Sequence, residues 1–238
     1  MINAFSIAFG QLSDKSFRRV IWVGLIGSCI IFAILWSAIG TALFSTQLYF
    51  TGWLWGLFDW VGEWLTDIFG GLAVVFLTGL LFPSVVTLIV SFFLEDAIKA
   101  VESRHYPELA DTRRQSVKEI VLITVKFTLI SLVLNILALP IYVIFFFIGP
   151  LNLFVFYALN GYLLGREYFE LVAHRRYDPL QAIHLRSAFK GKMFLAGVVI
   201  AFLMTIPVVN LVAPMVATAA MVHLVHAWQS RLNVLANR

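Results

Sequence analysis

The sequence IPVVNLVAP, residues 206–214, interrupts a stretch of 38 residues, Met193–Ser230, that contains no Lys, Arg, Asp or Glu. A second uncharged stretch, Phe127–Gly165, is interrupted in the same way by LPIYVIFFFIGPLN, residues 139–152. Proline stops or kinks a helix because it lacks the backbone N–H and clashes with the preceding turn. Each stretch therefore predicts two helical halves joined near the middle.

The length of these halves decides between a helix that crosses a bilayer and one that turns back. Each half holds about 13 to 16 residues, or roughly 20–24 Å at the rise of an α-helix. A spanning helix needs roughly 20 apolar residues, and two spans with a turn need roughly 43, whereas 39 and 38 are present. We therefore expect two re-entrant hairpins. The alternatives are prolines that only kink longer helices, or two tight full hairpins in a thinned bilayer.

The composition predicts an integral membrane protein. Of the 238 residues, 61% are hydrophobic and 13% are charged, which exceeds what one soluble core can bury. Cys29 is the only cysteine, which excludes an intrachain disulfide and a thiolate metal site. No cleavable signal peptide is expected, because the first 19 residues are too long and mixed for its charged region.

The distribution of charge predicts the topology. Residues 20–94 contain no Lys or Arg, and their only charges are three acidic residues between 59 and 67. The 17 basic residues lie in four other regions: 1–19, 95–126, 166–192 and 231–238. Because short loops rich in Lys and Arg stay in the cytoplasm, we expect these regions and both termini to be cytoplasmic. The net charge of +4 follows from this rule and indicates no nucleic-acid partner.

These constraints predict one all-α membrane domain, residues 1–238, with two long transmembrane helices and two re-entrant hairpins. The expected order is an interfacial helix (1–19), two long helices (20–106) with an outer loop near 51–67, a hairpin (127–165), a cytoplasmic basic helix (166–192) and a hairpin (193–230). The amphipathic face of the first helix carries Ile2, Phe5, Phe9 and Leu12. Four of the seven tryptophans lie between residues 53 and 64, which is typical of an aromatic belt.

Small residues four apart predict close helix packing in this chain. Such pairs are Gly24-x-x-x-Ser28, Gly52-x-x-x-Gly56 and Gly161-x-x-x-Gly165. If the hairpins stop partway, the chain has few full membrane spans. A single chain with so few spans cannot enclose a pore. We therefore expect a homo-oligomer in the lipid bilayer.

Motifs for catalysis are missing from the sequence. It contains no phosphate-binding Walker loop, no GxSxG and no HExxH, so we expect no enzyme and no cofactor. His223 and His226 have no nearby Cys or carboxylate in sequence, which predicts no metal site and is typical of interface residues with tips in headgroup water. No acidic residue lies in the four apolar runs, which favours a passive conduit over a proton-driven pump.

The sequence SDKSFRR, residues 13–19, predicts an anion site before the first long helix. Ser13 or Ser16 can cap the helix start, where unpaired N–H groups and the helix dipole attract anions. Arg18 and Arg19 add planar guanidiniums that suit sulfate or phosphate. The alternative is that this pair only satisfies the positive-inside rule. The predicted site consists of Ser16, Phe17, Arg18 and Arg19.

The two hairpin breaks predict a second polar surface. Freed backbone groups at membrane depth must be buried in protein or line a wet cavity. The residues that could line a path there are Pro150, Asn152, Pro207 and Asn210. The alternative is that these groups satisfy one another at the hairpin tips.

The segment TIPVVNLVAPMVATAAM, residues 205–221, resembles the carboxy-terminal signature of the CysZ sulfate-permease family, which is grouped with the etoposide-induced membrane proteins. The Arg18–Arg19 pair after an amphipathic amino terminus is similar to that family's first segment. The resemblance implies an oligomeric inner-membrane protein with two long spans and two partly penetrating hairpins. It also implies a sulfate site at the start of the first long helix. The chain departs from the family where Lys15-Ser16-Phe17 precedes the arginines and Gly24-Leu25 replaces a later proline.

The residues and the resemblance together predict a permease or channel of the bacterial inner (plasma) membrane. It would mediate sulfate uptake for sulfur assimilation and cysteine biosynthesis. The alternative function is a membrane scaffold or stress-linked accessory protein that transports nothing.

Overall fold

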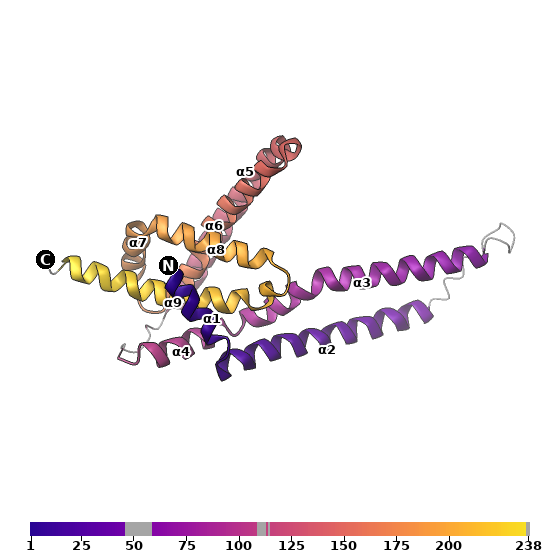
Figure 1. The fold of residues 1–238 in the computed structure, drawn as a ribbon, viewed down its shortest axis with the longest axis horizontal. Helices are drawn as coiled ribbons and strands as arrows, with labels where there is room; N and C mark the ends of the chain where they lie inside the picture. Colours follow the sequence, from indigo (N-terminus) through magenta and orange to yellow (C-terminus); the bar gives the residue numbers. More distant parts are fainter. Residues whose placement is uncertain (46–58, 109–112, 114, 237–238) are drawn as a thin grey trace. The chain divides into compact units, whose positions relative to one another are not determined.

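The computed structural model describes residues 1–45, 59–108, 113 and 115–236, and these residues form helices and connecting turns with no strand (Figure 1). The predicted all-α class is confirmed. The elements are α1 (Ile2–Gln11), α2 (Lys15–Ser45), α3 (Asp59–Ser91), α4 (Leu94–His105), α5 (Val117–Phe145), the 3₁₀ helix η1 (Phe146–Ile148), α6 (Pro150–Ala173), α7 (Pro179–Ala188), α8 (Lys190–Thr205) and α9 (Val209–Ala236). Much of the predicted outer loop, including Gly52 and Gly56, lies outside the described residues.

Within the described residues, four helical segments are long and apolar enough to cross a membrane. They are Lys15–Ile39, Val74–Ser91, Val117–Ile148 and Val209–Val234. Helices α7 and α8 meet at 84°, and they would form a fifth span if this bent pair crosses as one. Length and composition thus support a multi-pass membrane protein, and the division into two full spans and two re-entrant hairpins stays a prediction.

The described chain forms two compact units. One contains residues 19–92, where α2 and α3 run antiparallel, and the other contains residues 1–18 and 93–238. In the first unit, a Cβ at Gly24 would lie 2.9 Å from Cγ2 of Val90, and Ser28 is fully buried. The Ser28 hydroxyl donates a hydrogen bond to the Gly24 carbonyl at 2.8 Å. The predicted small-residue pair therefore provides close packing between α2 and α3.

The first predicted hairpin exists, but its halves are longer than expected. Ser116 caps α5 by accepting a hydrogen bond from the Glu119 backbone N–H at 3.2 Å, and α5 then continues through Pro140. The chain turns at η1 and Gly149, and Pro150 is the first residue of α6. Helix α5 has 29 residues and α6 has 24. The estimate of short halves is wrong here because charged residues on either side continue the same helices.

The second predicted hairpin turns at residues 206–208. Helix α8 has 16 residues, as the short-half estimate requires, whereas α9 has 28 and contains Pro214 in its interior. Val208, between them, has φ of 68°, a left-handed conformation that a β-branched residue rarely adopts. Only the first proline of IPVVNLVAP therefore ends a helix.

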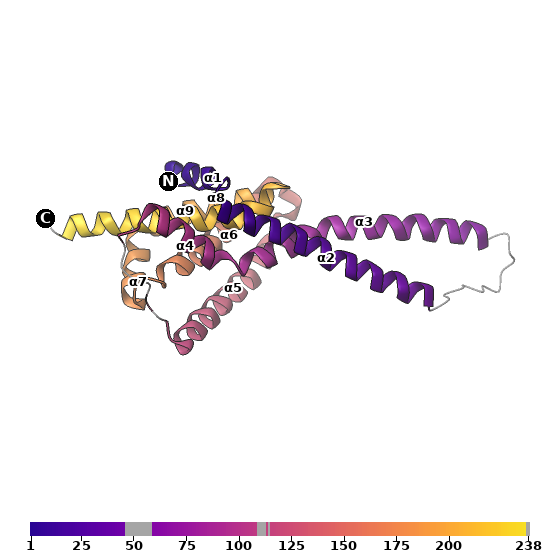
Figure 2. The same ribbon diagram turned by 90° about the horizontal axis from the view of Figure 1, so that it is seen from below.

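Helix α9 forms the centre of the larger unit. In its most apolar window 83% of the residues are buried. Helices α1, α4, α6 and α8 all pack against it (Figures 1 and 2). Small side chains such as Ala213, Ala217 and Ala220, each fully buried, let these neighbours approach closely.

Helices α6 and α8 cross at three glycines, as the predicted Gly161-x-x-x-Gly165 pair requires. A Cβ at Gly161 would lie 2.5 Å from Cγ2 of Val198, and one at Gly165 would lie 2.5 Å from the Met193 carbonyl oxygen. A Cβ at Gly197 would lie 1.8 Å from the Gly161 oxygen. No larger residue fits these positions without separating the helices.

Helix α1 buries Ala4, Phe5, Ala8 and Gln11, whereas Ile2 and Phe9 of the predicted apolar face are exposed, so its position at the membrane interface stays a prediction. The predicted basic helix, 166–192, is not one helix. It consists of the end of α6, all of α7 and the start of α8, because Asp178 and Gln181 form a capping box that starts a new helix at Pro179.

Candidate functional site

The predicted anion site lies in the first turn of α2. Ser16, Arg18 and Arg19 are exposed there, and Phe17 is buried with 1% exposure. The Arg18 backbone N–H reaches the Asp14 carbonyl at 2.9 Å, which closes the first helical turn. The N–H groups that precede it have no acceptor within the helix, as at any helix start. The first turn of α2 therefore combines positively charged arginine side chains with backbone N–H donors that have no acceptor within the helix.

Asp14, rather than a serine, immediately precedes α2. Its carboxylate forms an ion pair with Arg104 of α4. An acidic side chain at this position competes with an external anion for the same helix end. The Arg104 guanidinium offsets that negative charge, so Arg104 belongs to the electrostatic surroundings of the Arg18–Arg19 pair.

The predicted path-lining residues lie at the two hairpin tips. Pro150 and Pro207 are exposed, and the Oδ1 atoms of Asn152 and Asn210 are buried without a hydrogen-bond partner in the described part of the chain. A hydrogen bond of 3.2 Å between Tyr157 and Thr205 links α6 with the end of α8. Both tips thus carry the polar groups that the sequence predicts, and the role of these groups in a path stays a prediction.

A buried ionic cluster surrounds Glu102 of α4. Its Oε1 lies 2.7 Å from Nε of Arg176 and 3.6 Å from Nε2 of His226. Its Oε2 lies 3.7 Å from Arg175. Burial would raise the pKa of the Glu102 carboxyl, but interactions with His226, Arg176 and Arg175 outweigh it and lower that pKa to about 2. Glu102 is therefore ionised and ties α4 to the loop after α6 and to α9.

His223 belongs to a hydrogen-bonded chain beside this cluster. Its Nδ1 lies 2.8 Å from the Tyr106 hydroxyl, and its Nε2 lies 3.1 Å from Nε2 of Gln11 in α1. The Tyr106 ring packs against His226 in a tilted arrangement, with centroids 4.3 Å apart. His223 and His226 are only 7% and 8% exposed, so the interpretation of interface residues with wet tips is wrong. Sequence spacing showed the pair but not its partners, which lie more than 100 residues away.

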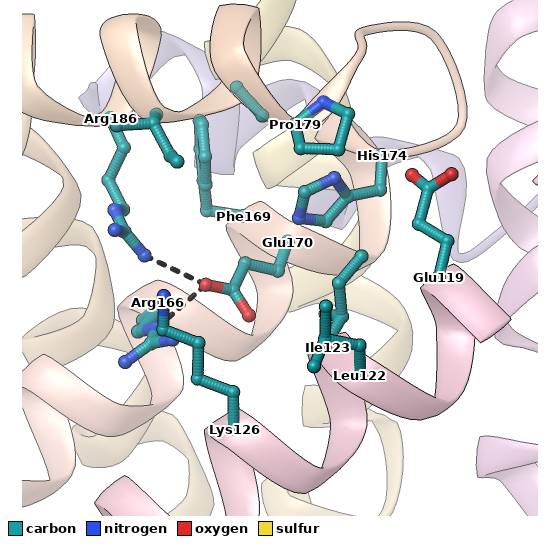
Figure 3. A pocket seen from close by; sticks show the side chains of 12 residues that line it. Glu119, Leu122, Ile123, Lys126, Arg166, Phe169, Glu170, His174, Pro179 and Arg186 are labelled. Atoms are coloured by element: carbon teal, nitrogen blue, oxygen red, sulfur yellow. Dashed lines mark hydrogen bonds and ion pairs between the residues drawn. The ribbon is translucent and has the colours of Figure 1, made fainter.

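A pocket that the sequence analysis did not find lies between α5, α6 and α7 (Figure 3). Its volume is about 140 Å³. Arg166 and Arg186 converge on one oxygen of Glu170, at 2.7 Å and 2.8 Å. The lining residues are Glu119, Leu122, Ile123, Lys126, Arg166, Phe169, Glu170, His174, Pro179, Ala182, Ile183 and Arg186.

Glu119 and His174 lie at the edge of this pocket in different electrostatic environments. Glu119 forms a two-bond ion pair with Arg113, at 2.7 Å and 2.6 Å. His174 is 8% exposed, and its buried Nδ1 has no hydrogen-bond partner within the described residues. Burial lowers the pKa of His174, which keeps the ring neutral at pH 7.

The apolar helices define a multi-pass helical membrane protein that carries basic side chains at several helix ends. Residues 4–214 match the family described as sulfate transporter CysZ/etoposide-induced protein 2.4. The chain belongs to this family, which confirms the resemblance seen in its sequence. No curated protein and no solved structure matches the chain.

Proposed function

We propose that this protein is a permease or channel for sulfate in the bacterial inner membrane, which supplies sulfur for cysteine biosynthesis. The observation that carries the proposal is the family match over residues 4–214, which includes both the start of α2 and the second hairpin tip. The same family relationship supports a homo-oligomer, and the distribution of Lys and Arg supports both termini in the cytoplasm.

Anion capture is assigned to the first turn of α2. The Arg18 and Arg19 guanidiniums each offer paired N–H donors that match an oxyanion, and the backbone N–H groups of Ser16 and Phe17 add the helix-end field. The Asp14–Arg104 ion pair supports capture because it offsets the one carboxylate at this helix end. No catalytic step and no cofactor are involved.

Passage is assigned to the two hairpin tips. The unpartnered oxygens of Asn152 and Asn210 and the exposed turn residues Pro150 and Pro207 would line a neutral polar path. The uncharged stretches hold no acidic residue to relay protons, which supports passive passage. In this proposal α2 and α3 are full spans and the α5–α6 and α8–α9 hairpins are re-entrant. The burial of α9 among other helices supports its place inside the protein.

Uptake of radiolabelled sulfate into proteoliposomes tests the function, and the double variant Arg18→Ala, Arg19→Ala tests the site. Loss of two charge-assisted contacts predicts a fall in uptake of at least about tenfold. The double variant Lys190→Ala, Lys192→Ala, which removes two exposed charges at the start of α8, is the control and should transport normally.

The possible outcomes separate the site from the function. Normal uptake by the arginine variant would overturn the site assignment. Wild-type protein that passes no sulfate, in a host that also grows normally on limiting sulfate without it, would favour the non-transporting scaffold.

A further inference from the structure

We propose that the pocket between α5, α6 and α7 binds a phosphate group that carries an O–H, and that this site is separate from the sulfate site at the start of α2. The ligand class is inorganic phosphate or the phosphomonoester headgroup of a lipid. The pocket would respond to a different anion from the one transported, so the inference goes beyond the proposed function.

The charges around the pocket favour an anion. Glu119 is neutralised by its two-bond contact with Arg113. Arg166 and Arg186 share the single carboxylate of Glu170, which leaves this triad with one positive charge in excess. Lys126 adds a second positive charge and has no ion pair in the part of the chain that the structure describes. Figure 3 shows its side chain beside the Arg166–Glu170 contact.

Burial strengthens this preference. Arg166 is 4% exposed, and the Glu170 side chain is 11% exposed. Charge-assisted hydrogen bonds in such surroundings are less screened than those in water. The contacts to Glu170 use Nε of Arg166 and Nη1 of Arg186, whereas each guanidinium carries five N–H donors. An oxyanion can therefore bind both arginines while their contact with Glu170 stays intact.

His174 is the second observation that points to a ligand. It lines the pocket, is more than nine-tenths buried, and its buried Nδ1 lacks a hydrogen-bond partner among the described residues. Its ring faces Glu170 in Figure 3. A buried polar atom without a partner is unfavourable, so a ligand that completes this hydrogen bond is stabilised by the site.

The acceptors in the pocket select phosphate over sulfate. The Glu170 carboxylate can only accept hydrogen bonds, and neutral His174 offers one acceptor nitrogen. Inorganic phosphate keeps an O–H at pH 7, because its last proton leaves only at strongly basic pH, and this O–H can donate to either acceptor. A phosphomonoester, whose second pKa is about 6, is largely doubly ionised at pH 7, but a hydrogen bond to the Glu170 carboxylate favours the form that keeps its proton. Sulfate has no proton to donate, and its oxygens would face the Glu170 carboxylate with like charge.

The size of the pocket excludes larger ligands. Its volume of about 140 Å³ is well below the roughly 300–1,000 Å³ of pockets that enclose whole organic ligands. Leu122 and Ile183, which are exposed parts of its wall, leave the pocket open toward an apolar surface. A headgroup with its acyl chains outside fits this shape as well as a free ion does.

Equilibrium binding of radiolabelled inorganic phosphate to the full-length protein in phosphatidylcholine nanodiscs tests the proposal, with sulfate as competitor. We expect sulfate to compete at least about tenfold less well than unlabelled phosphate, because it cannot donate to Glu170 or His174. Lys126→Ala should weaken phosphate binding about tenfold, whereas Lys118→Ala, which removes an exposed charge from the same helix outside the pocket, should leave it unchanged.

Two further binding measurements separate this site from the sulfate site and identify the source of the phosphate group. The Arg18→Ala, Arg19→Ala variant should bind phosphate normally, whether or not it transports sulfate. Phosphatidic acid in the nanodisc that displaces labelled phosphate identifies the lipid headgroup as a ligand, and binding that it does not affect identifies the free ion. Equal competition by sulfate, no phosphate binding, or unchanged binding by Lys126→Ala in a correctly folded protein would overturn the proposal.

Discussion

Replacing Gly197 by alanine tests the closest contact in the larger unit, the crossing of α6 and α8. The added Cβ would lie 1.8 Å from the Gly161 carbonyl oxygen and 2.5 Å from the Gly165 backbone nitrogen. Both atoms belong to the backbone of α6, so no side chain can rotate away. The two helices would have to separate by about 1.5 Å to reach ordinary van der Waals contact.

The expected cost combines two opposing effects. Alanine is a better helix former than glycine by about 1 kcal/mol. Separation of the helices loosens the buried contacts of α8, whose Met193, Ala196 and Ile200 are at most 3% exposed. Overpacking usually costs about 1–3 kcal/mol, and a clash with backbone lies at or above the upper end of that range. We expect a net loss of about 3 kcal/mol in the free energy of unfolding.

Denaturant unfolding of the purified protein in detergent micelles measures this loss. Gly191→Ala is the matched control, because Gly191 lies in the same helix and a Cβ there would meet nothing within 4 Å. It should be neutral or more stable by up to about 1 kcal/mol. A Gly197→Ala protein as stable as the wild type, or two variants with equal losses, would show that α6 and α8 do not approach this closely.

Two further predictions concern Glu102 and the turn before α9. Glu102→Gln removes the buried carboxylate that pairs with Arg175 and Arg176 and should destabilise the protein by about 3 kcal/mol at pH 7. The folded pKa of Glu102, about 2, lies below its usual 4.5, so its stabilisation is present above pH 4.5 and is lost as the pH falls toward 2. Unfolding experiments across this window should therefore show the gap between wild type and variant closing, and a constant gap would refute the assignment. Val208→Gly should raise the thermal unfolding temperature, with a net gain of about 0.5–1 kcal/mol, because glycine adopts the φ of 68° without strain; an unchanged or lower temperature would contradict the strained turn.

Local sequence features predicted the helices, two turns and the close packing sites. Gly149–Pro150 and Pro207 interrupt helices through their own backbone chemistry, so no distant contact is needed to place them. The glycine pair at 161 and 165 marks an interface because a missing Cβ matters wherever a helix is approached closely. The predicted lengths of α5 and α6 were too short, because Lys, Glu and Arg are good helix formers that end an apolar run without ending the helix.

The pocket and the Glu102 cluster could not be predicted in the same way. Glu102 and Arg176 are 74 residues apart, and the pocket brings together Glu119, Arg166 and Arg186 from three helices. Each residue in isolation fits the positive-inside rule or a solvated helix face equally well. Only the packing of α5, α6 and α7 shows which of these charges share a site.

The contrast between α5 and α9 shows what hydropathy misses in a membrane protein. Both contain long uncharged stretches, yet 6% of the apolar window of α5 is buried and 83% of that of α9 is buried. Helix α9 carries alanines and Thr218 where other helices approach, whereas α5 presents large exposed side chains such as Leu129, Ile136 and Ile144. Lipid tails are as apolar as leucine, so hydrophobicity does not separate the two environments. The alanines of α9 distinguish it from α5, because a small side chain at a crossing point lets a neighbouring helix approach closely.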